Sequence, residues 1–140
     1  MKIVFAGTPA NAAQTLRALA NSAFEVVAVL TRPDAPIGRK KILTPSAVAE
    51  VAQELGIPTI KANRVDESVR DQLAATGADL GIIVAYGALL DQAALDVLPK
   101  GWINLHYSLL PKWRGAAPVQ RSLMAGDRET GVTLFQLDKG

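Results

Sequence analysis

The chain has 140 residues, 49% of them hydrophobic and 20% charged, which is enough for one compact α/β domain and too few for two ordinary ones. A net charge of +2 excludes uniform attraction to a phosphate backbone, so any nucleic-acid contact must be local. There is no cysteine, which excludes disulfides, thiolate metal sites and a cysteine nucleophile. Since Gly7-Thr8-Pro9 interrupts the first apolar run, we expect a cytoplasmic protein without a membrane segment.

Short apolar runs alternate with stretches at helical spacing, a pattern typical of βαβ units. The runs with strand character lie near residues 2–6, 25–30, 57–60, 80–85, 102–106 and 131–137. Two early helices are expected to cover the sheet with apolar faces formed by Ala12, Leu16, Leu19 and Ala20, and by Val48, Val51, Ala52 and Leu55. The predicted fold is therefore α/β, with a mostly parallel, Rossmann-like sheet.

The second half of the chain predicts three shorter helices, near residues 66–73, 91–98 and 118–125. Asp66 suits the N-cap of the first of these, and Gly77 suits a stop just after its end. Pro99 is expected to end the second helix. Pro118 suits the first turn of the third.

Two connections are longer than a compact domain needs. The first, residues 31–46, holds three prolines and a glycine, so we predict a loop rather than a helix or an inner strand. It carries four basic residues, and its composition alone is typical of a solvated charge run. The second, residues 107–117, follows the strand that carries the only histidine.

Asn104 and His106 are two apart in a predicted strand, so their side chains are expected to point to the same face. Ligands of open parallel sheets bind outside the carboxyl ends of strands, where this pair lies. A carboxamide can donate to a developing oxyanion, and an imidazole, with an ordinary pKa of about 6.5, can exchange protons near neutral pH. The pair therefore suits acyl transfer to an amine that the substrate supplies.

A structural role for this pair is the alternative that the spacing leaves open. In that case His106 is an imidazole hydrogen-bonded at a strand edge, and Asn104 satisfies a turn. Trp102 and Trp113 are interpreted as packing residues.

Several separated motifs together resemble the methionyl-tRNA formyltransferases, a branch of the folate-dependent formyltransferases. The motifs are FAGTP at 5–9, RPDAPIGRKK at 32–41, VAYG at 84–87 and INLHYSLLPKWRGAAPVQ at 103–120. The pattern N-x-H-x-S-L-L-P is common to the wider family, whereas WRGAAP and the basic loop point to the tRNA enzymes. The resemblance runs from residue 3 to the last residue.

The resemblance implies transfer of a formyl group from 10-formyltetrahydrofolate to the amino group of methionine on initiator methionyl-tRNA. It implies catalytic roles for Asn104 and His106, without a metal. It implies folate-binding roles for Ser108, Leu109, Leu110, Pro111, Tyr86 and Gly87. It also implies that a basic loop enters the tRNA acceptor end, with contacts from Arg39, Lys40, Lys41 and Arg32. For Leu109 and Leu110, ordinary core packing remains the alternative.

The sequence departs from the family at its end. The family holds its histidine with an aspartate from a D-x-G-L-D run, and Asp138-Lys139-Gly140 matches only the opening of that run. We therefore expect residues 1–140 to be an incomplete amino-terminal formyltransferase domain, without the carboxyl-terminal tRNA-binding domain and with little or no activity alone. The full-length protein is expected to be a monomer.

Two other functions remain open on the sequence. The chain could come from a formyltransferase acting on an amino sugar or on glycinamide ribonucleotide. Alternatively, it could be a non-catalytic folate- or nucleotide-binding module. The first alternative can be distinguished by removing the charge of the loop at 38–41. Only an enzyme that acts on tRNA should need that charge.

Overall fold

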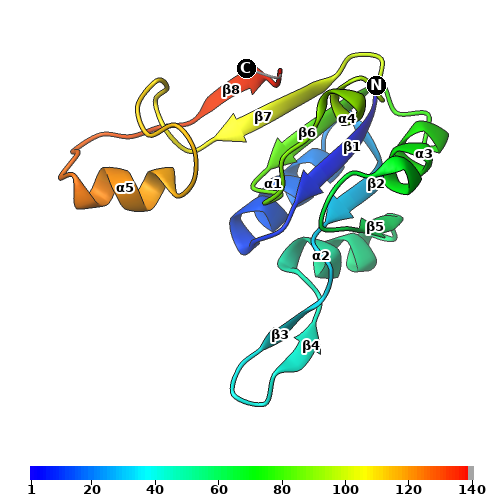
Figure 1. Ribbon diagram of the computed structural model, residues 1–140, viewed down its shortest axis with the longest axis horizontal. Helices are drawn as coiled ribbons and strands as arrows, with labels where there is room; N and C mark the ends of the chain where they lie inside the picture. Colours follow the sequence, from blue (N-terminus) through cyan, green and yellow to red (C-terminus); the bar gives the residue numbers. More distant parts are fainter. Residues whose placement is uncertain (139–140) are drawn as a thin grey trace.

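A six-stranded sheet forms the centre of the computed structural model, which describes residues 1–138 (Figure 1). From edge to edge the strands are β5 (Thr59–Lys61), β2 (Glu25–Thr31), β1 (Lys2–Gly7), β6 (Leu80–Val84), β7 (Trp102–His106) and β8 (Thr133–Gln136). Neighbours are parallel except for β8, which is antiparallel to β7. The prediction of an α/β fold with a mostly parallel sheet is confirmed.

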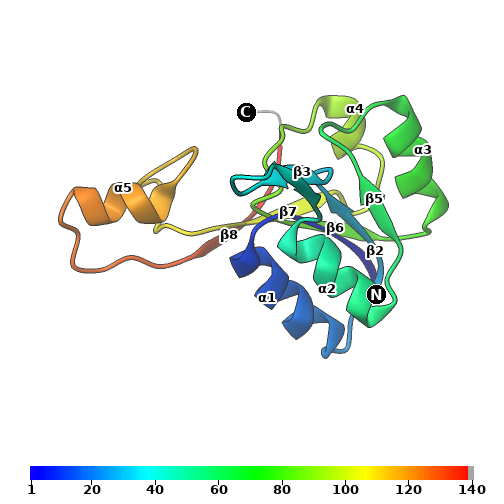
Figure 2. The same cartoon turned by 90° about the horizontal axis from the view of Figure 1, so that it is seen from below.

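Helices cover both faces of the sheet (Figure 2). On one face lie α1 (Ala10–Ala20) and α2 (Ala47–Leu55), and on the other lie α3 (Glu67–Ala75) and α4 (Gln92–Leu95). Each face has its own apolar cluster, because the side chains of buried strands point alternately to the two sides. The expected buried face of α1 is confirmed at Ala12 and Leu16, which are fully buried.

Two boundaries and the burial of one residue differ from those predicted, for reasons of local hydrogen bonding. The amide of Ile57 donates to the Ala52 carbonyl at 2.9 Å and completes the end of α2, so β5 begins at Thr59 rather than at 57. For the same reason Leu55, expected on the buried face, lies at the helix end and is 41% exposed. Helix α4 stops at Leu95 instead of 98, because the Val97 amide closes a tight turn onto Ala94.

The connection over residues 31–46 contains an antiparallel hairpin rather than an irregular loop. Its strands are β3 (Ala35–Ile37) and β4 (Ile42–Thr44), which form a separate two-stranded ribbon projecting below the sheet in Figure 1. Gly38 and Lys41 both have positive φ angles, 77° and 48°, and close the turn. The prediction that no inner strand forms here is confirmed, but the predicted loop has paired strands at its centre.

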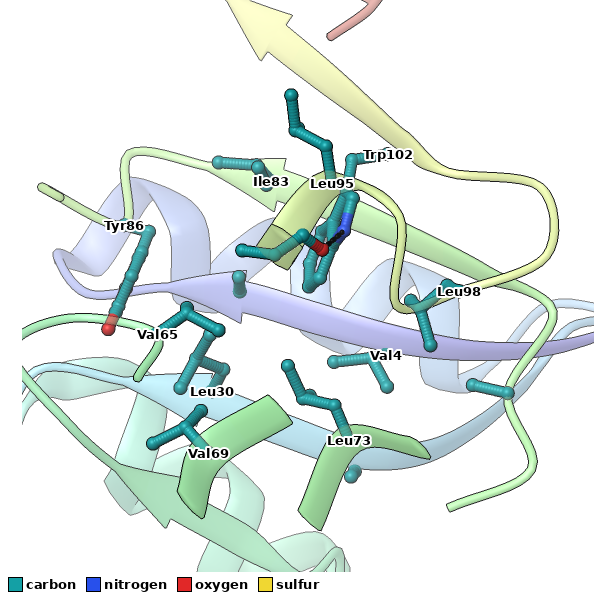
Figure 3. Packing of buried hydrophobic residues seen from close by; sticks show 14 residues of the cluster. Val4, Leu30, Val65, Val69, Leu73, Ile83, Tyr86, Leu95, Leu98 and Trp102 are labelled. Atoms are coloured by element: carbon teal, nitrogen blue, oxygen red, sulfur yellow. Dashed lines mark hydrogen bonds between the residues drawn. The ribbon is translucent and has the colours of Figure 1, made fainter. Parts of the chain in front are cut away.

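Trp102 packs beneath α4, in the cluster that α3 and α4 cover (Figure 3). It is fully buried, and its Nε1 donates to the Ala94 carbonyl at 3.0 Å. Gly81 pairs directly with it across β6 and β7, and a Cβ at Gly81 would come within 2.1 Å of the indole. The missing side chain at Gly81 is therefore what makes room for the ring. This confirms Trp102 as a packing residue.

The segment after β7 forms an arm that leads away from the rest of the sheet (Figures 1 and 2). It contains α5 (Pro118–Met124) and returns through β8. Leu123, Met124 and Leu134 are 70%, 88% and 66% exposed. The arm is therefore attached mainly through the pairing of β8 with β7.

Candidate active site

Asn104 and His106 lie on the last residues of β7, at the carboxyl edge of the parallel strands. Asn104 is in register with Ile83 on β6, whose side chain belongs to the same apolar cluster as Trp102. Leu105, between the two polar residues, packs on the opposite face. The strand thus places Asn104 and His106 on the α3 and α4 side, and both are half-buried.

The carboxamide of Asn104 has no hydrogen-bond partner within residues 1–138. A half-buried amide without a protein partner keeps its donors and its acceptor available for a ligand. The alternative that Asn104 satisfies a turn therefore has no hydrogen bond to support it in the described part of the chain.

The ring of His106 does have a partner: its Nε2 lies 2.8 Å from the Trp113 carbonyl oxygen. A carbonyl can only accept, so Nε2 carries the hydrogen, and the lone pair of the neutral ring is on Nδ1. The hydrogen bond expected from a purely structural role is thus present. It uses one ring nitrogen and leaves the other for chemistry.

The turn Ser108-Leu109-Leu110-Pro111 is held by hydrogen bonds from both ends. The buried Ser108 hydroxyl donates to the Lys112 carbonyl at 2.7 Å, and Thr133 on β8 donates to the Ser108 carbonyl at 2.7 Å. Leu109 is 49% exposed, and neither leucine belongs to the two core clusters. Core packing therefore does not explain these leucines in the described part of the chain.

A cavity of about 460 Å³ lies at the same edge of the sheet, where β1, β2 and β6 end. This is the point at which the chain's connections turn to opposite sides of β1, and open α/β sheets bind ligands there. Its lining includes Thr8, Arg32, Asn63, Tyr86 and Gly87. Asn104 and His106 are not among its lining residues and lie one strand further along.

Arg32 stabilises the wall of this cavity by two hydrogen bonds. Its Nε donates to Asn63 Oδ1 at 3.0 Å, and its Nη1 donates to the Gly87 carbonyl at 2.7 Å. The side chain therefore ties the end of β2 to the turn after β6. Arg39, Lys40 and Lys41 are exposed at the hairpin tip, so the structure does not bring Arg32 together with these three.

Tyr86, expected beside a ligand, contributes to the cavity while its ring is buried in the core (Figure 3). Its hydroxyl donates to the Ala62 carbonyl at 2.5 Å. Burial raises the pKa of Tyr86 above its ordinary value, and the nearby Arg32 guanidinium opposes this by lowering it. The neutral phenol is thus the form that the fold favours.

Alkaline pH is expected to destabilise the protein through Tyr86. Its pKa is higher in the folded than in the unfolded chain, so its contribution is complete below the unfolded value of about 10 and is lost as the pH rises through the folded pKa. We expect the free energy of unfolding, measured by urea denaturation between about pH 9 and pH 11.5, to fall more steeply for the wild type than for Tyr86→Phe. Parallel curves would contradict this assignment.

The sequence did not single out Thr8, Asn63 or Asp127. Thr8 donates to the Tyr86 carbonyl at 2.8 Å, and Asp127 accepts from the indole of Trp113. A turn signal was visible at Gly7-Thr8-Pro9, but no local pattern marks Asn63 or Asp127. Of the motif at the chain end, Lys139 and Gly140 lie outside the described residues.

No cluster of three or more metal-ligating side chains occurs within residues 1–138. In the same residues no helix has both the length and the apolar character needed to cross a membrane.

Comparison with known sequences gives matches over the whole chain. A family model described as Formyl transferase matches residues 1–140. A methionyl-tRNA formyltransferase of Clavibacter sepedonicus is 58% identical over 140 residues, which are all of this chain and 46% of that protein. One of Arthrobacter sp. (strain FB24) is 60% identical with the same coverage. The chain spans just under half the length of these relatives.

Solved structures give the same fold at low identity. A phosphoribosylglycinamide formyltransferase from Bacillus halodurans superposes with a TM-score of 0.79 at 20% identity, covering 100% of this chain and 73% of that one. A glycinamide ribonucleotide transformylase 1 from Symbiobacterium toebii gives 0.77 at 19% identity, covering 100% and 67%. These similarities are evidence for the fold alone.

Proposed function

Because the chain belongs to the formyl transferase family, we propose that it is the amino-terminal, catalytic part of an enzyme that transfers a formyl group from 10-formyltetrahydrofolate to initiator methionyl-tRNA. The resemblance found in its motifs is confirmed by the family match and by the identity of 58–60% to proteins named methionyl-tRNA formyltransferase. The tRNA substrate is taken from the names of these relatives. The protein would act in the cytoplasm, as a monomer, with tRNA contacts also from a carboxyl-terminal domain.

The observation that carries the proposal is the pair at the end of β7. Asn104 offers a carboxamide with no partner in the described part of the chain, and His106 offers Nδ1, which carries the lone pair when the ring is neutral. The amine attacks the formyl carbon, a C–N bond forms, and the oxygen gains negative charge that Asn104 stabilises. His106 takes the proton from the amine. The tetrahedral centre then collapses, the bond to the folate nitrogen breaks, and His106 passes the proton it took to that nitrogen.

This step needs no covalent intermediate on the protein, because the substrate brings its own nucleophile. A donor placed at the developing oxyanion typically contributes about 10²–10³ in rate, and a positioned acid or base about 10²–10⁴. An aspartate beyond residue 140, expected from the family pattern, would stabilise the imidazolium that forms when Nδ1 has taken the proton.

The folate site is proposed between the cavity and the turn after β7. A volume of about 460 Å³ lies in the range of small-molecule sites. Tyr86 and Gly87 form part of its wall, and the exposed Leu109 with Leu110 and Pro111 offers apolar surface to a flat ring. The residues present therefore fit a heteroaromatic donor substrate.

The proposal is tested with a chimaera in which the missing half of the Clavibacter relative follows Gly140. We expect the chimaera to transfer labelled formyl from 10-formyltetrahydrofolate to methionyl-tRNA, while residues 1–140 alone show little or no transfer. Transfer only to an amino sugar or to glycinamide ribonucleotide would favour the small-molecule alternative. Folate binding without any transfer would favour a non-catalytic module.

Removing charge from the hairpin tip is expected to weaken tRNA use selectively. In the chimaera, Arg39→Ser, Lys40→Ser and Lys41→Asn together should raise KM for methionyl-tRNA about tenfold or more, because these exposed cations would contact phosphates. The slope of affinity against salt should fall by about two to three, and folate binding should not change. Asparagine is chosen at 41 because it tolerates the positive φ.

A control variant removes charge from the opposite end of the strands, where β1 and β7 begin. Lys2 begins β1 and Lys100 precedes β7, and both are exposed. Replacing both by serine should leave KM for tRNA nearly unchanged. An equal loss in the control and in the hairpin variant would mean that overall charge, and not the hairpin, attracts the tRNA.

A further inference from the structure

The backbone at Trp113 adopts a conformation that side chains rarely take. Its φ is +58°, in the left-handed region, which is unfavourable for a non-glycine residue unless the surroundings hold it. Trp113 is half-buried and belongs to neither core cluster. Core packing in the described residues therefore does not account for this conformation.

Two side chains hold the indole of Trp113. Its Nε1 donates to Asp127 Oδ2 at 2.8 Å, and the Arg121 guanidinium lies 5.5 Å from the ring centroid. Arg121 also donates to the Arg114 carbonyl at 2.9 Å, which fixes the chain just after the tryptophan. A charge-assisted hydrogen bond and a cation–π contact thus fasten one ring from two directions.

This arrangement directs the carbonyl of Trp113 at the candidate catalytic ring. The carbonyl oxygen accepts from His106 Nε2 at 2.8 Å. The position of that oxygen follows from the backbone torsions of Trp113, which the indole contacts stabilise. A chain of contacts therefore runs from Asp127 through Trp113 to His106.

We propose that Trp113, fastened by Asp127 and Arg121, is a positioning residue that holds His106 with its hydrogen on Nε2 and leaves Nδ1 as the nitrogen that exchanges protons. The inference deepens the proposed function and rests on it for the catalytic meaning of His106. The positioning itself is a property of this chain and can be measured without substrate.

The test uses NMR on residues 1–140, where His106 is the only histidine and its ring signals are unambiguous. Imidazole N–H protons that face water exchange too fast to be seen, whereas a hydrogen-bonded one is protected. We expect a visible Nε2–H signal in the wild type. In Asp127→Ala we expect it to be lost, or to exchange about fivefold faster, as one hydrogen bond's contribution of about 1 kcal/mol implies.

Matched variants separate positioning from general damage. Asp127→Asn keeps an acceptor for the indole and should retain the signal, while Glu129→Ala, an exposed neighbour, removes the same charge and should also retain it. Trp113→Phe keeps an aromatic ring but loses the donor, so it should behave like Asp127→Ala. If Asp127→Ala fails to fold, the comparison of Asp127→Asn with Trp113→Phe decides.

No protected Nε2–H in the folded wild type, or equal protection in Trp113→Phe and Asp127→Asn, would overturn the proposal. Neither result would touch formyl transfer, which the chimaera assay measures separately. Conversely, a protected signal that depends on Asp127, together with an inactive chimaera, would retain the positioning and reject the proposed reaction.

Discussion

Replacing His106 by alanine in the chimaera is expected to lower the single-turnover rate of formyl transfer about 100-fold or more. The substrate amine would lose the group that takes its proton. The affinity for the folate donor should stay nearly constant, because the proposed folate contacts come from the turn at 108–111 and from Tyr86 and Gly87. Rapid quench gives the rate, and fluorescence titration gives the affinity.

Three further variants make this result specific to the pair on β7. Asn104→Ala should lower the rate about 10²–10³-fold, and the double variant should lose less than the product of the two effects, since both act on one tetrahedral centre. Tyr107→Phe changes the adjacent residue, which packs on the opposite face, and should leave the rate unchanged. Wild-type turnover by His106→Ala would remove His106 from the mechanism.

Replacing Trp102 by alanine is expected to lower the free energy of unfolding by about 3–5 kcal/mol. The indole is fully buried between the sheet and α4, so its loss leaves a cavity that the strands cannot close. The Ala94 carbonyl would also lose its donor. Urea denaturation followed by circular dichroism measures the change, which for an average domain is a large part of the total stability.

A double-mutant cycle with Gly81 tests the reason for that loss. Gly81→Ala alone should destabilise by about 1–3 kcal/mol or more, because its Cβ meets a ring that has no free space to move into. In the Trp102→Ala background the same methyl group enters the new cavity, so its cost should nearly vanish. Additive effects of the two substitutions would show that the ring and the glycine are not in the contact described.

The sheet was predictable because its strands are buried on both faces and read as continuous apolar runs. Lys2–Gly7, Glu25–Thr31 and Trp102–His106 were located within a residue or two for this reason. The hairpin at 35–44 was not, because its strands are three residues each and its apolar side chains, such as Leu43, are exposed. A strand is recognisable in a sequence when its side chains are buried, and the side chains of this hairpin are mostly exposed.

The candidate site shows the same limit at the level of single side chains. The pair Asn104 and His106 could be placed on one face from strand periodicity alone. The partner of His106 could not, because it is a backbone carbonyl whose direction depends on a left-handed torsion at Trp113. Asp127, fourteen residues later, gives no local signal of its contact with that indole.

Asn104 and Trp113, the two residues on either side of His106 in the candidate site, are held by parts of the fold that differ in stability. Asn104 lies on β7, which pairs with β6 of the main sheet at Ile83, so its position does not depend on the arm alone. Within this chain, Trp113 belongs to a segment with exposed leucines and little buried apolar area, so we expect residues 1–138 alone to open there at a lower free energy than elsewhere. The backbone of His106 is therefore held by the sheet, whereas the orientation of its ring depends on the hydrogen bond to Trp113 and is kept only while the arm stays closed.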